Sequence, residues 1–149
     1  MKRIAGFLLV LSTLMVSSAA YATTYIIETL TCNLDDADVD DSQVYLSLYG
    51  TANQFSYFQL DNSDRDDLER NAIDAFQLHT FDLGDLTSAV VELVGDDGWC
   101  FEWIAINDTS TGRVWTFYYG TWLDGDSRAP QLVVCTPESE FSGFCSAVR

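Results

Sequence analysis

Positive charge is the scarcest property of this 149-residue chain. Lysine occurs only at position 2, histidine only at position 79, and proline twice, while acidic residues outnumber Lys and Arg by 23 to 7. The resulting net charge of −16 repels phosphate backbones and bare anionic lipid, which excludes nucleic acid as a partner. Divalent cations are the natural counterions of such a protein.

The sequence patterns of common enzyme classes are also missing. The chain has no G-x-S-x-G elbow, no glycine-rich phosphate loop and no H-E-x-x-H motif. His79 alternates with Ala75 and Gln77 in a strand-like run, so we interpret it as a strand residue and not as a catalytic base. A glycosidase-type carboxylate pair stays open as a third hypothesis, because 23 acidic residues make chance pairs unavoidable. We expect no enzymatic activity.

Long apolar runs are absent except near the N-terminus. Lys2 and Arg3 precede an apolar run over 6–16, and a small-x-small site ends at Ala22. This pattern predicts a secretory signal peptide over 1–22, with a buried N-terminal helix as the alternative. Removing 22 of the 149 residues leaves 127, enough for one domain, and removes two positive charges, so the net charge becomes −18. The sequence therefore predicts a secreted protein, either extracellular or periplasmic.

The four cysteines of an exported chain indicate disulfides, and three pairings are possible. Cys135 and Cys145 are close in sequence, so we expect them to close a small loop. That pairing leaves Cys32 with Cys100. No C-x-x-C pair supports a metal site built from these residues.

Short runs of β-branched and aromatic residues alternate with polar turn clusters, and no helical period of useful length occurs after the predicted signal peptide. One helical turn is possible at 66–71. The pattern predicts an all-β domain, an eight-stranded antiparallel β-sandwich over 23–135. A polar C-terminal tail over 136–149 would be held by Cys145, or would be a frayed terminus. The eight expected strands cover 24–31, 44–49, 55–60, 72–80, 88–94, 100–107, 113–118 and 131–135.

Five aspartates crowd the segment 33–41, which suggests a calcium loop. Asp36, Asp38 and Asp40 have the spacing of an EF-hand start, but Asp41 replaces the required glycine and Ser47 the required glutamate. The segment therefore fails as a self-contained calcium loop. It can still form one wall of a composite site if the acidic segments 64–69 and 95–98 fold beside it, since calcium relieves repulsion between clustered carboxylates. Otherwise each segment is a solvated turn.

Several segments in fixed order resemble the PLAT domain, the module of polycystin, lipoxygenase and alpha-toxin. The resemblance covers residues 24–134 and implies an eight-stranded, two-sheet sandwich. It also implies a non-catalytic module that docks to membrane lipid or to a protein partner, often with calcium. The segments are YII at 25–27, DSQVYLSLYG at 41–50, LDNS at 60–63, DDLERNAIDAF at 66–76, DLGDLT at 82–87, GW at 98–99, STGRVWTF at 110–117 and WL at 122–123.

The resemblance implies site residues of two kinds: calcium ligands on three loops, and two tryptophans that face the membrane. The sequence departs from the family in having Val39-Asp40 before Asp41, and in lacking a cysteine and an arginine within 117–122. Trp99 and Trp122 match membrane-facing positions, although either indole can instead cap an end of the sandwich. The calcium ligands that the resemblance implies are Asp41, Asp66, Asp67 and Glu69, with Asp96 or Asp97.

The other aromatic residues are expected inside the protein. Trp103 alternates with Phe101 and is interpreted as a core residue, as is Trp115 beside Phe117. The sequence thus favours a monomeric, secreted module that docks with calcium to membrane lipid or to a lipid-associated protein. A calcium-independent protein-interaction module is the alternative.

Overall fold

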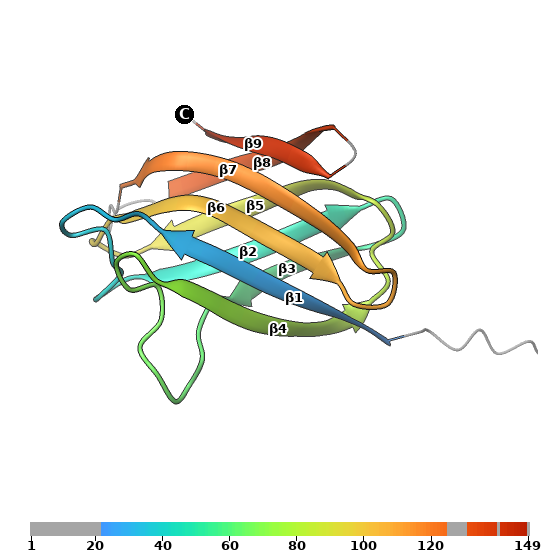
Figure 1. Cartoon of the computed structure of the whole chain (residues 1–149), viewed down its shortest axis with the longest axis horizontal. Coiled ribbons are helices and arrows are strands. Elements are labelled where there is room, and N and C mark those ends of the chain that lie inside the picture. Colours follow the sequence, from blue (N-terminus) through green and yellow to red (C-terminus); the bar gives the residue numbers. More distant parts are fainter. Residues whose placement is uncertain (1–21, 125–130, 140, 149) are drawn as a thin grey trace, which may run out of the picture.

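The computed structural model describes residues 22–124, 131–139 and 141–148, and all regular structure in this part of the chain is β (Figure 1). The signal-peptide prediction falls on residues outside this part, apart from Ala22. Within the described residues there is no helix of the length and apolarity needed to cross a membrane. The strands are β1 Ala22–Thr31, β2 Gln43–Gly50, β3 Gln54–Gln59, β4 Ile73–Phe81, β5 Leu86–Val94, β6 Trp99–Asp108, β7 Arg113–Leu123, β8 Gln131–Ser139 and β9 Ser142–Ala147.

The strands form one continuous hydrogen-bonded sheet that folds into two layers. Its order is β3-β2-β5-β8-β9-β7-β6-β1-β4. In Figure 1, β4, β1, β6 and β7 form the near layer, β3, β2 and β5 lie behind it, and the β8–β9 pair links the layers along one side. All neighbours are antiparallel except β7 and β9, which run parallel. The expected all-β sandwich is confirmed, with one strand more than predicted.

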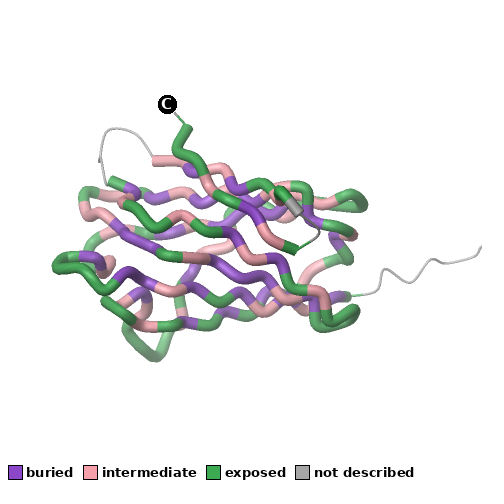
Figure 2. Tube along the Cα trace, turned by 45° about the horizontal axis from the view of Figure 1, so that its top comes forward, coloured by how far each residue is buried: buried purple, intermediate pink, exposed green. Residues whose placement is uncertain are grey.

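The core lies between the two layers, and it follows from alternation along each strand (Figure 2). In β1 the side chains of Thr23, Tyr25, Ile27 and Thr29 are buried, while their neighbours face outward. Trp115 is also buried, as the sequence predicted. Each large apolar side chain removed from water in this way contributes about 2 kcal/mol to stability before entropy is counted.

The C-terminal segment differs from the prediction of a polar tail. β8 continues to Ser139, beyond the expected end at 135, and β9 then pairs with both β8 and β7. The Cys135–Cys145 disulfide joins two directly opposed residues of β8 and β9. Alternation is weak in this polar stretch, so its pairing with β7 could not be read from the sequence.

Both predicted disulfides are present. Cys32 and Cys100 are bonded across a sequence separation of 68, and Cys135 and Cys145 across a separation of 10. The first bridge forms a second small core with Ala37, against which Trp122 packs. It fixes the start of the loop after β1 to the start of β6.

Trp103 does not lie in the core, which corrects the expectation from its alternation with Phe101. Opposite β6, Thr31 of β1 pairs with Phe101 and Leu30 pairs with Trp103, so Glu102 is an extra residue. This β-bulge shifts the alternation by one position. Phe101 and Ile104 therefore face the core, whereas Trp103 is half-buried on the outer face.

Candidate functional site

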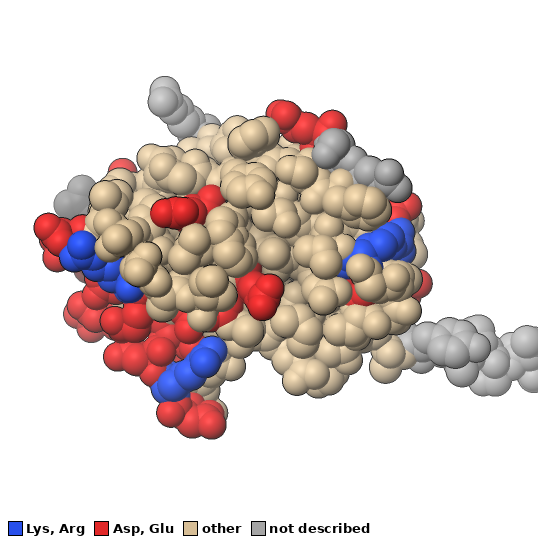
Figure 3. All heavy atoms as spheres, in the orientation of Figure 1, with Lys and Arg blue, Asp and Glu red and all other residues tan. Residues whose placement is uncertain are grey.

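Acidic residues gather at one end of the sandwich, at the left in Figure 3. Three connections meet there, and we call them the acidic loops. Loop A (32–42) joins β1 to β2, loop B (60–72) joins β3 to β4, and loop C (95–98) joins β5 to β6. They contain the three acidic segments that the sequence analysis required to come together.

Hydrogen bonds tie loop A to loop C. The Asp40 backbone nitrogen donates to the Asp97 Oδ2 atom at 2.8 Å. The Ser42 hydroxyl accepts a hydrogen bond from the Asp97 nitrogen at 2.9 Å and donates to the Asp97 carbonyl at 3.1 Å. Asp97 is thus a structural link between the loops, in addition to its predicted role as a ligand.

Loop A is also tied to loop B. Arg70 forms an ion pair with Asp35, and its Nε atom donates to the Asn33 side chain at 3.2 Å. The Asn71 nitrogen donates to the Cys32 carbonyl at 3.2 Å. Arg70 therefore has the structural role of pairing with an acidic neighbour, while it holds the first half of loop A in place.

Loop B is anchored in the core by Leu68. Its side chain is buried, its backbone has a φ of 62°, and its nitrogen donates to the Asp74 Oδ2 atom at 2.8 Å. A left-handed backbone conformation of this kind is uncommon for leucine and persists only when its surroundings hold it. The anchor places Asp67 and Glu69, which flank it, at the end of the sandwich.

Asp67 serves mainly to organise loop B. Its Oδ1 atom accepts hydrogen bonds from the Asn62 side chain at 2.8 Å and from Arg65 Nε at 2.9 Å, and its Oδ2 atom accepts from the Asn62 backbone. Its side chain is only 6% exposed. Because both oxygens already have donors, Asp66 and Glu69 are the more available carboxylates of this predicted ligand segment.

A polar cavity of about 170 Å³ lies between loops A and B. Its lining includes Asp40 from loop A, and Asp61, Arg65 and Asp66 from loop B. Carboxylate oxygens are the ligands that calcium prefers. The cavity therefore brings together oxygen donors from two segments far apart in sequence.

The acidic loops are close enough to perturb one another's titration. The charge of Asp38 raises the pKa of the Asp40 carboxyl above its ordinary value. Partial desolvation also raises this pKa, as do the charges of Asp97, Asp41 and Asp66. Contributions to one carboxyl from all three loops show that these segments form a single electrostatic cluster.

Glu69 belongs to the same cluster. Partial desolvation raises the pKa of its carboxyl, followed by the charges of Asp66, Asp38 and Asp40. Such repulsion favours either a bound proton or a bound cation. Asp38 and Asp40, which the family positions did not include, contribute directly to it; their spacing in the sequence was the only available signal.

The donor types suit calcium, but the described residues contain no group of three or more acidic, His or Cys side chains already placed to hold a metal ion. Asp66 lines the cavity together with Asp40, and Glu69 belongs to the same electrostatic cluster. Asp41 and Asp96 are exposed, in loops A and C. The cluster is thus a set of oxygen donors without a preformed cage.

Neither tryptophan carried over from the family is a free membrane anchor. Trp99 is 0% exposed, its Nε1 atom donates to Thr31 at 3.1 Å, and its ring stacks on Phe101. The membrane-facing prediction for Trp99 is therefore wrong, because the residue opens β6 on the core side. Trp122 is half-buried against the Cys32–Cys100 disulfide.

Comparison with known proteins gives consistent results. The mouse and human proteins named lipoxygenase homology domain-containing protein 1 are 32% and 34% identical over 91 and 90 residues. These alignments cover 56% of this chain but only 4% of either relative. The chain therefore corresponds to a small part of those proteins.

Solved structures with the same fold include a lipoxygenase and a bacterial toxin. A structure of coral 8R-lipoxygenase, which is activated by calcium through a C2-like domain, has a TM-score of 0.62 at 22% identity. It matches over 67% of this chain and 15% of its own. Alpha toxin from Clostridium absonum has a TM-score of 0.59 at 16% identity, over 78% of this chain and 32% of its own. The sequence over residues 25–135 matches the PLAT/LH2 domain family, and the chain belongs to that family.

Proposed function

We propose that this protein is a secreted, non-catalytic module that docks to membrane lipid or to a lipid-associated protein with the help of calcium. The observation that carries the proposal is the convergence of loops A, B and C into one cluster of mutually repelling carboxylates. Support for calcium also comes from the coral 8R-lipoxygenase, in which calcium activation is linked to a C2-like domain. Two disulfides are consistent with an extracellular protein.

Calcium has a specific electrostatic task in this proposal. A chain with a net charge of −16 is repelled by anionic headgroups. A divalent ion held by Asp40, Asp66 and Glu69 would offset two of the negative charges at this end of the sandwich and could coordinate a phosphate oxygen. The same end carries Leu34, which is 49% exposed in loop A and is available for shallow contact with a lipid surface.

Calorimetric titration with calcium, followed by vesicle flotation with calcium or with a chelator, tests the proposal. We expect Asp66→Asn to weaken calcium binding by about tenfold, because Asp66 lines the cavity and raises the pKa of both Asp40 and Glu69. Glu28→Gln is the matched control, since it removes the same charge from an exposed position on β1. Unchanged vesicle binding and thermal stability with and without calcium would overturn the calcium part.

A calcium-independent protein-binding module is the second candidate, and a specific surface favours it. Exposed apolar side chains lie on the near layer, including Ile73 at 61%, Phe81 at 58% and Val114 at 40%. Exposed apolar side chains mark a protein interface where they form a contiguous patch. Capture of one partner with the chelator present, by a protein that binds no vesicles, would favour this candidate.

A further inference from the structure

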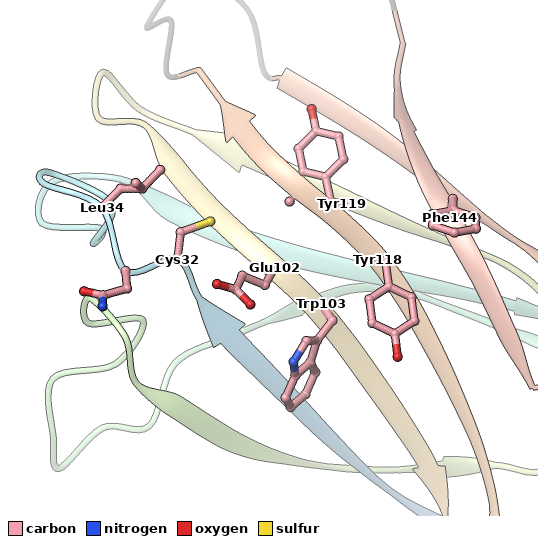
Figure 4. Close-up of a pocket in the computed structure, with 9 residues that line it drawn as sticks. Cys32, Leu34, Glu102, Trp103, Tyr118, Tyr119 and Phe144 are labelled. Carbon is pink, nitrogen blue, oxygen red and sulfur yellow. The ribbon is translucent and has the colours of Figure 1, made fainter.

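A groove of about 460 Å³ opens on the outer face of the near layer, away from the cavity between loops A and B (Figure 4). Leu34 lies at one end and Phe144 at the other, with Glu102, Trp103 and Tyr118 between them. This groove shares no lining residue with the acidic cavity. Apart from Leu34, its lining residues take no part in the proposed function.

Three aromatic side chains line up across neighbouring strands of this groove. Trp103 on β6 pairs with Tyr118 on β7, and Tyr118 pairs in turn with Phe144 on β9. The Tyr118 and Phe144 ring centroids are 6.1 Å apart, and these side chains are 43% and 57% exposed. Exposed rings at this spacing can contact a ligand together.

The β-bulge in β6 makes this arrangement possible. Because Glu102 is the extra residue relative to β1, Glu102 and Trp103 both lie on the groove side, as Figure 4 shows. β-Bulges often re-aim side chains in this way next to binding sites. A strand without the bulge would turn Trp103 into the core, as its alternation with Phe101 suggested.

The charge of the groove selects the ligand class. Glu102 is the only charged residue in its lining. No described residue forms a hydrogen bond or an ion pair with its carboxylate. The face around it is mostly uncharged in Figure 3. Aromatic ring faces are electron-rich, so rings together with a carboxylate favour a cation.

The form of the cation follows from the walls. A primary ammonium group would lose its hydration against aromatic walls that offer few acceptors, which is costly. An N-methylated ammonium group is bulky, weakly hydrated and well suited to aromatic faces. A phosphate attached to it would be repelled by Glu102, so a headgroup such as phosphocholine fits less well than a free quaternary ammonium compound.

We propose that the groove formed by Trp103, Tyr118, Phe144 and Glu102 binds a small, free quaternary ammonium compound such as choline. The cavity volume lies within the range of small-molecule sites. Trp103 and Tyr118 contact the methyl groups, and Glu102 supplies the opposite charge. The site needs no calcium, because its lining residues are separate from those of the acidic cavity.

Calorimetric titration in the presence of a chelator tests this assignment, with choline, ethanolamine and phosphocholine as the probes. Choline should bind about tenfold more tightly than ethanolamine, which has the same carbon chain but no methyl groups. Trp103→Ala and Tyr118→Ala should each weaken choline binding by about tenfold, and Glu102→Gln by several-fold. Phe81→Ala is the control, since Phe81 is an exposed aromatic residue outside the groove.

Three results would overturn the proposal. The first is equal binding of choline and ethanolamine, or none of either. The second is choline binding that Trp103→Ala leaves unchanged in a variant whose thermal melting shows it is folded. The third is binding of phosphatidylcholine vesicles or phosphocholine without binding of free choline, which would make the groove a lipid site. The first two results leave calcium-dependent docking untouched, because the chelator removes calcium throughout. The third would mean that lipid binding at the groove needs no calcium.

Discussion

The hydroxyl of Ser42 bonds both backbone polar groups of Asp97, a residue 55 positions further along the chain. It accepts from the Asp97 nitrogen at 2.9 Å and donates to the Asp97 carbonyl at 3.1 Å. Loops A and C are not paired as strands, and the Ser42 side chain satisfies the backbone polar groups of Asp97 that strand pairing would otherwise satisfy. The contact holds the acidic loops at a fixed separation without adding or removing charge.

Replacing Ser42 with alanine should loosen this end of the sandwich. Ser42→Ala removes two hydrogen bonds, so the free energy of unfolding should fall by about 1–2 kcal/mol. Calcium affinity should also fall, although every carboxylate is retained. Urea denaturation and calorimetric titration measure the two effects. Ser56→Ala, at an exposed position on the edge strand β3, is the control, and equal behaviour of the two variants would contradict the assigned role.

Gly95 gives a second way to test the same contact. Its φ is 142°, and a Cβ atom built on it would lie 2.2 Å from the Ser42 Oγ atom. Gly95→Ala would therefore strain the backbone and displace Ser42 together. We expect a loss of stability at least as large as that of Ser42→Ala, with the same loss of calcium affinity. A fully stable Gly95→Ala protein would show that loop C is not held as described.

Stability should depend on pH in a direction set by the acidic cluster. The pKa values of Asp40 and Glu69 are raised above the ordinary 3.8 and 4.5, so the folded state holds protons that the unfolded state releases. Their contribution to stability therefore decreases as the pH rises through the region just above those values, and calcium at neutral pH should restore it. Thermal melting between about pH 4 and pH 7 measures this.

The Asp66→Asn variant isolates that effect from other titrating groups. Asp66 raises the pKa of both Asp40 and Glu69, so its removal should flatten the stability profile and raise stability at neutral pH without calcium. The same change weakens calcium binding in our proposal. Parallel profiles for the wild type and the variant would show that the acidic loops do not repel one another in solution.

The pKa of Asp108, at the other end of β6, is shifted in the opposite direction, below its ordinary value. Burial alone would raise the pKa of its carboxyl. Hydrogen bonds from Ser110 and Thr111 outweigh burial and lower it; the Ser110 nitrogen donates at 2.9 Å, and the two hydroxyls each donate at 2.7 Å. Asp108→Ala should cost about 2 kcal/mol at neutral pH.

The cost of Asp108→Ala should shrink in acid. A lowered pKa means that the stabilisation is present above the ordinary value of 3.8 and is lost as the pH falls through the folded-state value. Denaturation at neutral and acidic pH measures the change. Asp82→Ala, which removes an exposed turn acceptor for Gly84, should cost less than about 0.5 kcal/mol at either pH. Equal costs for the two variants would refute the role given to Asp108.

Local sequence patterns predicted most of the strands and core positions, but not the β-bulge that changes which side chains face the core. Alternation located the core positions of β1 and the burial of Trp115, and proximity in sequence suggested the Cys135–Cys145 bridge. Alternation failed at Trp103, because a bulge opposite Leu30 is set by pairing between strands distant in sequence. The prediction for Trp99 failed for a related reason. A residue beside a polar turn can be fully buried when it is the first residue of a strand and its side chain faces the core.

The candidate site also contains residues that the sequence predicted and residues whose role it could not predict. Composition identified the acidic segments, and family position selected Asp66 and Glu69, both of which lie in the electrostatic cluster. The internal role of Asp67 was not predictable, because it depends on where loop B places Asn62 and Arg65. A local sequence pattern cannot specify which of two adjacent carboxylates will accept the internal hydrogen bonds of a folded loop.

The two disulfides should differ in what they contribute to stability. Cross-linking lowers the entropy of the unfolded chain more when the closed loop is longer, and the separations here are 68 and 10 residues. Replacing Cys32 and Cys100 with serine should therefore cost about 2 kcal/mol more than replacing Cys135 and Cys145. The first bridge also packs against Ala37 and Trp122, which adds to the difference.

Only the first replacement should affect the acidic loops. The Cys32–Cys100 bridge fixes the start of loop A, whereas Cys135–Cys145 lies in the β8–β9 pair. Urea denaturation of the two double variants measures stability, and calorimetry measures calcium affinity. We expect calcium affinity to fall only when the first bridge is removed. Equal losses of affinity for both variants would indicate a general loss of folding, and a larger loss for the second would contradict the role given to loop A.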